Sequence, residues 1–541
     1  MSTEAPQKRK HYQLHRWVGI ISGFLGVLVF GSGAVATFHH ELDAWAHRGE
    51  PMPAVLSLGG FSLDKAFATA GANVDPKFKH AVNIFQRGPH PLGFFFHEHE
   101  EGSGGQVTEV GVYTEVHPKT GEVVYRKEGT AEEVFKPKPL AALSDFFLQL
   151  HILLLMPRTM GLVATGLIGF SLLVLVATGY LVHRPSPART HGFPSDEGRR
   201  PFYGKLHTWV GSWTLPYTVV LAMTGTFFSF AGAVLIPVMA LVAFDGDMET
   251  LIRTVVGKVE VSKSEEVASL DPILADARER YPHADFETLA LDEWGKEDAN
   301  ATVFLVEHGA LGESRVQLVY DGHSGDFIME KPQLGTEPSV GNSLLLLMGY
   351  LHFGTLLGIV TKVLWGLLGL ATCAIAASGL VIFGLRQEKL GTRWVGAVRI
   401  GIVALVGGLP AAFAGTALAW AIGVGVGVNP AAAMPWVFAL LTAAVAASTA
   451  RLPSLRTAIA SGWGAAALFL LFLPFANLAA TGSSPGALWS QPDLRATLAV
   501  DVVLIISAAL AMAATLRLLG GARSEKDSIE GQSAASASVA L

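Results

Sequence analysis

The sequence is poor in cysteine and in charge. Cys373 is its single cysteine, which excludes an intramolecular disulfide, a CxxC redox pair and a CxxCH site for covalently attached c-type haem. Charged residues make up 16% of the chain, against roughly 25% in soluble domains, while 50% of its residues are hydrophobic. This balance excludes a cytosolic enzyme and predicts an integral membrane protein in contact with a lipid bilayer.

Two further absences limit the function. The net charge is −6 and no long basic block follows the first residues, so a nucleic-acid partner is not expected. No GxGxxG motif follows a predicted strand, so the chain is not expected to bind NAD(P)H in the usual way. Any redox chemistry would therefore belong to a non-covalent cofactor whose electrons come from elsewhere.

Long apolar runs recur along the chain. Eight stretches approach the ~20 residues that a membrane-crossing helix needs, and they are 14–38, 154–182, 207–241, 345–384, 398–423, 434–450, 457–478 and 498–519. Lysine and arginine gather in every second connection, beginning with the segment before the first span. The distribution predicts that both termini lie in the cytoplasm. The first span exceeds the apolar region of a cleavable signal peptide and lacks its cleavage site, so we expect it to be retained.

Two polar segments of domain size fall on the outer side of the membrane, at 41–145 and 245–343. Each contains an amphipathic helix, at 61–70 and at 270–281, and a hairpin turn that ends in Gly121 or in Gly325. The predicted fold class is a membrane all-α bundle of about eight helices with two periplasmic α+β domains. The expected organisation is an N-terminal tail with the first span (1–40), an outer domain (41–145), a second span (146–185), a cytoplasmic loop (186–205), a third span (206–244), an outer domain (245–343), a fourth span (344–386), a four-helix tail (387–519) and a disordered cytoplasmic end (520–541).

The chain is an internal duplication. The run from Leu14 to Gly19 matches the run from Leu206 to Gly211, and Leu150-His151 matches Leu351-His352. Further matches join Gly33 to Gly225, Phe38 to Phe230, 166–169 to 366–369, and Gly179 to Gly379. Residues 11–185 and 203–386 are thus two copies of helix, outer domain and helix. Parallel repeats of this kind place paired sites at the repeat interface.

Four of the 18 histidines recur in both copies at or within the membrane: His15, His151, His207 and His352. Ionisable groups in such positions are costly and by default functional. Helical bundles hold b-type haem by presenting imidazoles from facing helices to the two axial positions of the iron. Two repeated pairs predict two haem b groups bound by these histidines. The alternative is that His15 and His207 are interfacial residues that reach toward headgroups.

The two pairs differ in expected depth. His151 precedes His183 by 32 residues, about 48 Å along a continuous helix. The pair His15 and His207 is therefore expected near the cytoplasmic surface and the pair His151 and His352 at the outer surface. This separation is long for direct electron transfer, unless helix tilt or a break near Pro157 shortens it.

Other histidines form a second tier of candidates. His39, His40 and His183 end spans but have no histidine at the matching positions of the second copy, and we treat them as alternative haem ligands. The segment from His97 to Glu100 alternates imidazole and carboxylate and could bind a metal ion, although a solvated acidic loop is the favoured interpretation.

The motifs taken together resemble the PepSY-associated transmembrane helix family. The resemblance rests on 14–19, on 38–43, on the turns at Gly121 and Gly325 and on the Leu-His pairs at His151 and His352. Family members are iron-regulated inner-membrane proteins of Gram-negative bacteria, and some are haem-containing ferric-siderophore reductases. The resemblance covers about 11–386 and implies PepSY-like periplasmic domains, haem b bound by the four repeated histidines, and reduction of a ferric siderophore at the periplasmic face.

Three functions remain open at this level. The first is a haem-dependent reductase that takes electrons from quinol or from a cytoplasmic flavoprotein and passes them to a ferric siderophore, which releases Fe²⁺ for uptake. The second is a siderophore or metal import or binding subunit without redox activity. The third is a scaffold whose PepSY-type domains bind a partner protein.

Overall fold

A computed structural model describes residues 4–49, 61–86, 91–101, 107–136, 138–183, 199–257, 259–264, 266–309, 312–452, 454–491 and 494–539. It forms two compact units. The helical unit comprises the described parts of Met1–Gly49, Pro137–Phe230 and Leu364–Leu541, and the sheet unit those of Glu50–Lys136 and Ala231–Val363. Most of the predicted cytoplasmic loop, residues 184–198, lies outside the described residues.

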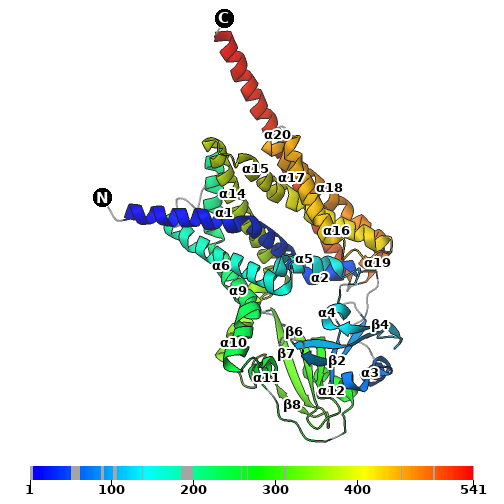
Figure 1. The fold of residues 1–541 in the computed structure, drawn as a ribbon. Coiled ribbons are helices and arrows are strands. Elements are labelled where there is room, and N and C mark those ends of the chain that lie inside the picture. The colour runs from blue at the N-terminus through cyan, green and yellow to red at the C-terminus, as the bar shows by residue number, and fades with distance from the viewer. Residues whose placement is uncertain are drawn as a thin grey trace. The chain divides into compact units, whose positions relative to one another are not determined.

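The helical unit contains both copies of the Leu-His-x-Trp-Val-Gly motif and the tail. Its helices are α1 (Glu4–Ala36), α2 (His39–Ala46), α5 (Ala142–Leu153), α6 (Arg158–His183), α8 (Arg199–Trp213), α9 (Leu215–Phe230), α14 (Ile359–Leu390, whose first residues belong to the sheet unit), α15 (Val395–Val403), α16 (Leu409–Gly425), α17 (Met434–Ala447), α18 (Leu455–Thr481), α19 (Pro485–Ser490) and α20 (Arg495–Val539) (Figure 1).

Seven helical segments in the described part of the chain are long and apolar enough to cross a membrane. They are Gln7–Ala36, Arg158–His183, Leu215–Ala243, Ile359–Leu390, Val395–Gly425, Leu455–Thr481 and Arg495–Gly520. The predicted sixth span is helical but short, as Met434–Ala450, so the expected count of eight is not met by length. Leu367, Leu468 and Leu510 are exposed on these helices, as contact with lipid requires.

A short helix with a histidine in its last turn precedes the second span of each repeat. After α5, Leu154 and Leu155 adopt positive φ values of 52° and 58°, and α6 begins only after Pro157. In the second repeat, α13 (Val340–Phe353) ends at Gly354, whose φ is 69°. The continuous helix expected between His151 and His183 is therefore wrong, because left-handed residues and a proline interrupt the helical hydrogen bonds.

The sheet unit is built on one eight-stranded antiparallel sheet with the order β4-β3-β2-β1-β5-β6-β7-β8. Its strands are β1 (Ala81–Phe85), β2 (Leu92–Glu101), β3 (Val107–Val116), β4 (Val123–Thr130), β5 (Asp285–Asp292), β6 (Asn300–Gly309), β7 (Gly312–Asp321) and β8 (Phe327–Glu330). Its helices are α3 (Leu63–Gly71), α4 (Ala131–Val134), α10 (Ile236–Ala243), α11 (Met248–Val256), α12 (Leu270–Arg280) and α13. Helices α3 and α12 pack on the apolar core of this sheet (Figure 1).

The two polar segments 41–145 and 245–343 share this sheet because β1 pairs with β5, with Val82 opposite Leu291 and Ile84 opposite Leu289. The expectation of two separate α+β domains is corrected accordingly. All four of these side chains are almost fully buried. Burying an apolar edge of each segment against the other removes two exposed strand edges.

The predicted elements within each segment are confirmed. Helices α3 and α12 coincide with the expected amphipathic helices, and the turns before Gly121 and Gly325 close the hairpins β3–β4 and β7–β8. Gly121 and Gly325 have φ values of 71° and 78°, which glycine adopts without strain. Strands β1, β2, β5 and β6 were not predicted from the sequence.

The two halves cap each other's helices. The carboxylate of Asp271 accepts hydrogen bonds from the Ser62 hydroxyl at 2.7 Å and from the backbone amide of Leu63 at the start of α3. The carboxylate of Asp64 accepts the equivalent bonds from Ser269 and from Leu270 at the start of α12. A constant offset of 207 residues relates these partners, so the duplication seen in the sequence is also a symmetry of the folded sheet unit.

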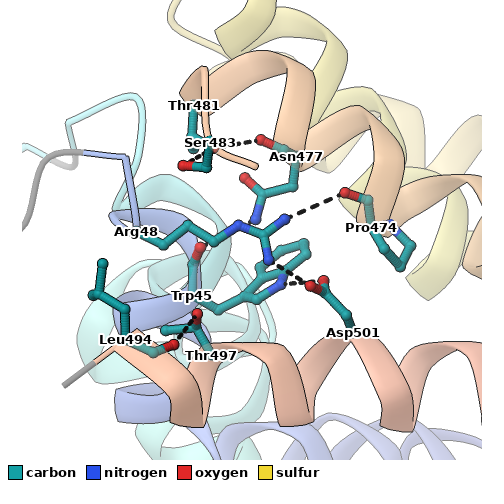
Figure 2. Close-up of polar contacts among 9 residues, drawn as sticks. All are labelled: Trp45, Arg48, Pro474, Asn477, Thr481, Ser483, Leu494, Thr497 and Asp501. Carbon is teal, nitrogen blue, oxygen red and sulfur yellow. Dashed lines mark hydrogen bonds and ion pairs between the residues drawn. The ribbon is translucent and has the colours of Figure 1, made fainter. Parts of the chain in front are cut away.

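A buried polar cluster joins the tail to the first repeat (Figure 2). The Arg48 guanidinium donates to Asp501 of α20 at 2.6 Å and to the Pro474 carbonyl oxygen of α18 at 3.3 Å. Trp45 Nε1 donates to the same Asp501 carboxylate at 2.7 Å, and the Asn477 amide donates to the Trp45 carbonyl oxygen at 3.0 Å. The tail thus holds the segment that follows the first span through a buried ion pair and hydrogen bonds. Helix α20 is continuous to Val539 and so includes most of the end that we predicted to be disordered from 520.

Candidate functional site

His15 and His207 are held in the same way in the two repeats. On α1, His15 Nδ1 lies 3.1 Å from the Leu175 carbonyl oxygen and 3.1 Å from the Thr178 hydroxyl oxygen, both on α6. On α8, His207 Nδ1 lies 2.9 Å from the Ile375 carbonyl oxygen and 3.2 Å from the Ser378 hydroxyl oxygen, both on α14. The contacted residues of the first repeat lie 200 positions before those of the second repeat. The same offset relates the second spans of the two repeats.

These contacts define the tautomer of each ring. A carbonyl oxygen can only accept a hydrogen bond, so the proton lies on Nδ1, which donates to Leu175 in one repeat and to Ile375 in the other. In the neutral imidazole the lone pair is then on Nε2. Histidines that bind metals commonly donate their other ring N–H to a backbone carbonyl in this manner.

The two rings face each other. Their centroids are 6.1 Å apart and their planes are inclined at 85°. Two imidazoles that bind one metal ion through bonds of about 2 Å, with about 1 Å from each ring nitrogen to its ring centre, would have ring centres about 6 Å apart. The donor chemistry and the ring separation of His15 and His207 therefore fit a haem that both residues would hold.

Glycine provides the space beside both rings. A Cβ atom on Gly179 would lie 3.3 Å from His15 Cε1, and one on Gly379 would lie 3.3 Å from His207 Cε1. That distance is tighter than an ordinary van der Waals contact, so a larger residue would push on the ring. The recurrence of glycine at these positions therefore has a steric explanation.

His151 occupies the last turn of α5 and contacts α1. Its Nδ1 donates to the Val29 carbonyl oxygen at 3.0 Å, which again leaves Nε2 as the ligand atom. Val29 is 14 residues from His15 on α1, so the two histidines are separated by about 21 Å along that helix. The length of about 48 Å along a continuous helix from His151 to His183 does not apply, because the helix is interrupted between Leu153 and Arg158, a break of the kind considered near Pro157.

His352 has the corresponding place in its own repeat, in the last turn of α13. It belongs to the sheet unit, and its ring lies 5.3 Å from that of Phe353. Its pairing with His151 stays a prediction.

The second-tier histidines lie at the ends of two different helices. His39 and His40 begin α2, and their ring centroids are 3.8 Å apart. His183 ends α6 and lies within electrostatic range of both His15 and His207. The structure thus groups His183, and not His39 or His40, with the facing pair.

One known protein family matches the part of the chain that contains both repeats. The family model of the PepSY-associated TM region matches residues 12–386. The chain belongs to this family. The match covers both repeats and ends before α15, so the tail helices α15–α20 lie beyond it. No curated protein matches the chain.

The family and the seven apolar helices together establish a multi-pass membrane protein. Sequence reasoning found the histidines of the facing pair but missed Thr178 and Ser378. A signal existed, because both are small hydroxyl residues one position before a repeated glycine.

Proposed function

We propose that this PepSY-associated membrane protein is a haem b-dependent reductase that passes electrons across the bacterial inner membrane to a ferric siderophore in the periplasm. The observation that supports the proposal most is the facing of His15 and His207, each fixed by the same backbone hydrogen bond in its repeat. A haem held by these two imidazoles would supply one-electron chemistry.

The residues of this chain would hold and orient that cofactor. His15 and His207 would present Nε2 to the iron, and the carbonyls of Leu175 and Ile375 would keep the protons on Nδ1. His151 would serve a second haem with His352, and the contact with Val29 would fix its ring. His183, which lies near the first pair, is the alternative ligand there.

The substrate follows from the chemistry of iron. Fe³⁺ binds strongly to hard oxygen donors, and Fe²⁺ binds them more weakly, so one electron loosens the ion from its chelator. The electron would come from quinol or from a cytoplasmic flavoprotein, since the chain lacks a nucleotide-binding motif. In this arrangement both termini are cytoplasmic and the sheet unit is periplasmic.

The first test is the absorption spectrum of the purified protein, oxidised and reduced by dithionite. The proposal predicts a Soret band, sharpened α and β bands on reduction, and two haem b per chain. His15→Ala and His207→Ala should each reduce the haem content to about one per chain. His11→Ala, which changes a histidine on the same helix as His15, should leave the content at two.

The second test is transfer of electrons from reduced protein to a ferric siderophore, followed as formation of an Fe²⁺–ferrozine complex. A haem-free preparation that still transports or binds a siderophore would instead support an import subunit without redox activity. A haem-free preparation that captures a protein but no siderophore would support a PepSY-type scaffold. Unchanged haem content in both alanine variants would reject the ligand pair.

A further inference from the structure

A second cluster of metal-ligand side chains lies in the sheet unit, outside the proposed haem sites. The candidate ligand atoms of His97, His99 and Glu109 all lie within 4.8 Å of one another. His97 and His99 come from β2, and Glu109 comes from β3, where it pairs directly with His99. Two strands of one hairpin therefore supply two imidazoles and a carboxylate to one point.

Strand geometry selects these residues from the histidine- and glutamate-rich segment. Successive side chains of a strand point to opposite faces, so His97 and His99 share one face while Glu98 and Glu100 share the other. Glu98 forms an ion pair with Lys77 at 2.8 Å on its own face. The solvated loop favoured from the sequence is wrong, since the segment is part of β2, and the third ligand is Glu109 and not Glu98 or Glu100.

His97 is preorganised as a ligand. Its side chain is buried and stacks on Phe95, with ring centroids 4.7 Å apart and an interplanar angle of 3°. Its Nδ1 donates to the Phe95 carbonyl oxygen at 3.2 Å, so the lone pair is on Nε2.

The other two ligands can close on an ion. The side chains of His99 and Glu109 are 55% and 42% exposed, and the His99 Nε2 to Glu109 Oε1 distance is 3.8 Å. Side chains with this freedom can move by the ångström or so needed to reach metal bonds of about 2 Å. The exposed ligands also give an ion a direct path from solvent.

Asp292 adds negative charge at the end of β5. It follows Leu291, which pairs with Val82, so it lies next to Ala81, the partner of His97. A carboxylate in this position favours a cation bound by the two rings.

The second half of the sheet shows that the fold does not require this cluster. With the offset of 207 residues, Phe304 and Val306 take the places of His97 and His99, and Phe304 pairs with Thr288 as His97 pairs with Ala81. Arg315, the partner of Val306, stands where Glu109 stands in the first half. The ligand set therefore belongs to one repeat only.

We propose that His97, His99 and Glu109 form a binding site for a divalent first-row transition-metal ion such as Zn²⁺. Two imidazoles exclude the hard ions Mg²⁺ and Ca²⁺, which prefer oxygen ligands. The site does not depend on haem or on reductase activity.

The test uses the full-length, tag-free protein as purified, titrated with Zn²⁺ by calorimetry and with Co²⁺ by its visible ligand-field absorption. The expected result is one ion per chain at this site, with His99→Ala and Glu109→Gln each weakening Zn²⁺ binding by about tenfold or more. Glu100→Gln is the matched control, because it removes the same charge from the neighbouring strand position on the opposite face. Its affinity should equal that of the unmodified protein.

Two results would overturn the site. The first is that His99→Ala and Glu109→Gln bind Zn²⁺ as tightly as the unmodified protein does. The second is that Glu100→Gln weakens Zn²⁺ binding as much as those two variants do. The mutated side chains are partly exposed, and an unchanged absorption spectrum and unfolding temperature would show that the variants are folded. His97→Gln, which keeps a similar volume in the buried position, should also reduce Co²⁺ absorption, while haem content stays constant in every variant.

Discussion

Arg48 and Asp501 form a buried ion pair across 453 positions of sequence, with an N–O distance of 2.6 Å. The Arg48 side chain is fully buried and that of Asp501 is 12% exposed. Asp501 also accepts a hydrogen bond from Trp45, so one carboxylate holds two side chains of the first repeat. Because Asp501 lies in an apolar helix of the tail, this contact gives residues 387–541 a structural role that the sequence did not reveal.

Removing the carboxylate should destabilise the helical unit. In Asp501→Asn the charge of Arg48 stays buried without its counter-ion, and the expected cost is about 3–5 kcal/mol. The measurement is the temperature at which the detergent-solubilised protein unfolds or aggregates. The double variant Arg48→Met/Asp501→Leu should recover much of the loss, since a well-packed apolar pair can replace a buried ion pair.

Arg495→Gln is the control for this prediction. Arg495 begins the same helix and its side chain is exposed, with a hydrogen bond to the Trp489 carbonyl oxygen. A surface change of this kind is worth roughly 0.5 kcal/mol or less. If Asp501→Asn were no more damaging than Arg495→Gln, the ion pair would not hold the tail in place.

Because each half of the sheet unit caps a helix of the other half, a mutation in one half should affect a helix in the other. Asp271→Ala should loosen the start of α3, and Asp64→Ala should loosen the start of α12, because each carboxylate caps the helix of the other half. Each loss should amount to about 1–2 kcal/mol. Hydrogen exchange measured by mass spectrometry should therefore speed up in the helix that was not mutated.

Asp75→Ala provides the matched control, since Asp75 caps only its own short helical turn through Lys77. Exchange in α3 and α12 should be unaffected by it. Faster exchange confined to the mutated helix itself in Asp64→Ala would contradict the reciprocal arrangement.

The extent to which this protein could be predicted from its sequence depended on the repeats. His15 and His207 were found because identical motifs surround them, and the structure brings their rings to 6.1 Å. Their hydrogen-bond acceptors could not be predicted, because a backbone carbonyl such as that of Leu175 can belong to any residue type. Thr178 and Ser378 could have been noticed, since both precede a repeated glycine.

The strands that join the two halves were missed for a different reason. β1 has only five residues, and its core positions Val82 and Ile84 carry too short an alternation to distinguish a strand from a loop. The pairing of β1 with β5 joins residues about 200 positions apart, and local periodicity contains no information about such a partner. Pro157 indicated a possible break before the second span, but the left-handed conformations of Leu154 and Leu155 could not be predicted, because both residues continue an apolar run.

Asp321 makes the stability of the sheet unit sensitive to acid. Burial raises the pKa of this carboxyl, but hydrogen bonds from the backbone amides of Ser262, His323 and Ser324 outweigh that effect and hold its pKa at about 2. Since the usual value is about 3.9, this carboxylate stabilises the fold at pH values above that, and the stabilisation is lost as the pH falls toward 2. Asp321→Asn should lower the unfolding temperature at pH 6 and flatten its decline between pH 4 and 2. Asp326→Asn changes an exposed residue of the same hairpin, and its unfolding temperature should fall between pH 4 and 2 as it does in the unmodified protein. If the unfolding temperature of Asp321→Asn fell in the same way, Asp321 would not be the group that makes the unit sensitive to acid.

Gly33 offers a way to disturb the outer histidine without removing it. A Cβ atom at this position would lie 2.7 Å from His151 Cε1 and 2.9 Å from its Nδ1, so Gly33→Ala must displace the ring and break its bond to Val29. If His151 binds haem, the variant should lose about one haem per chain or show a shifted reduction potential for one of the two, measured by pyridine haemochrome assay and by spectroscopic redox titration. Gly211→Ala is the control, because a Cβ atom there meets nothing within 4 Å. Full haem content with both potentials unchanged in Gly33→Ala would mean that His151 is not a ligand, while His15 and His207 could still be tested on their own.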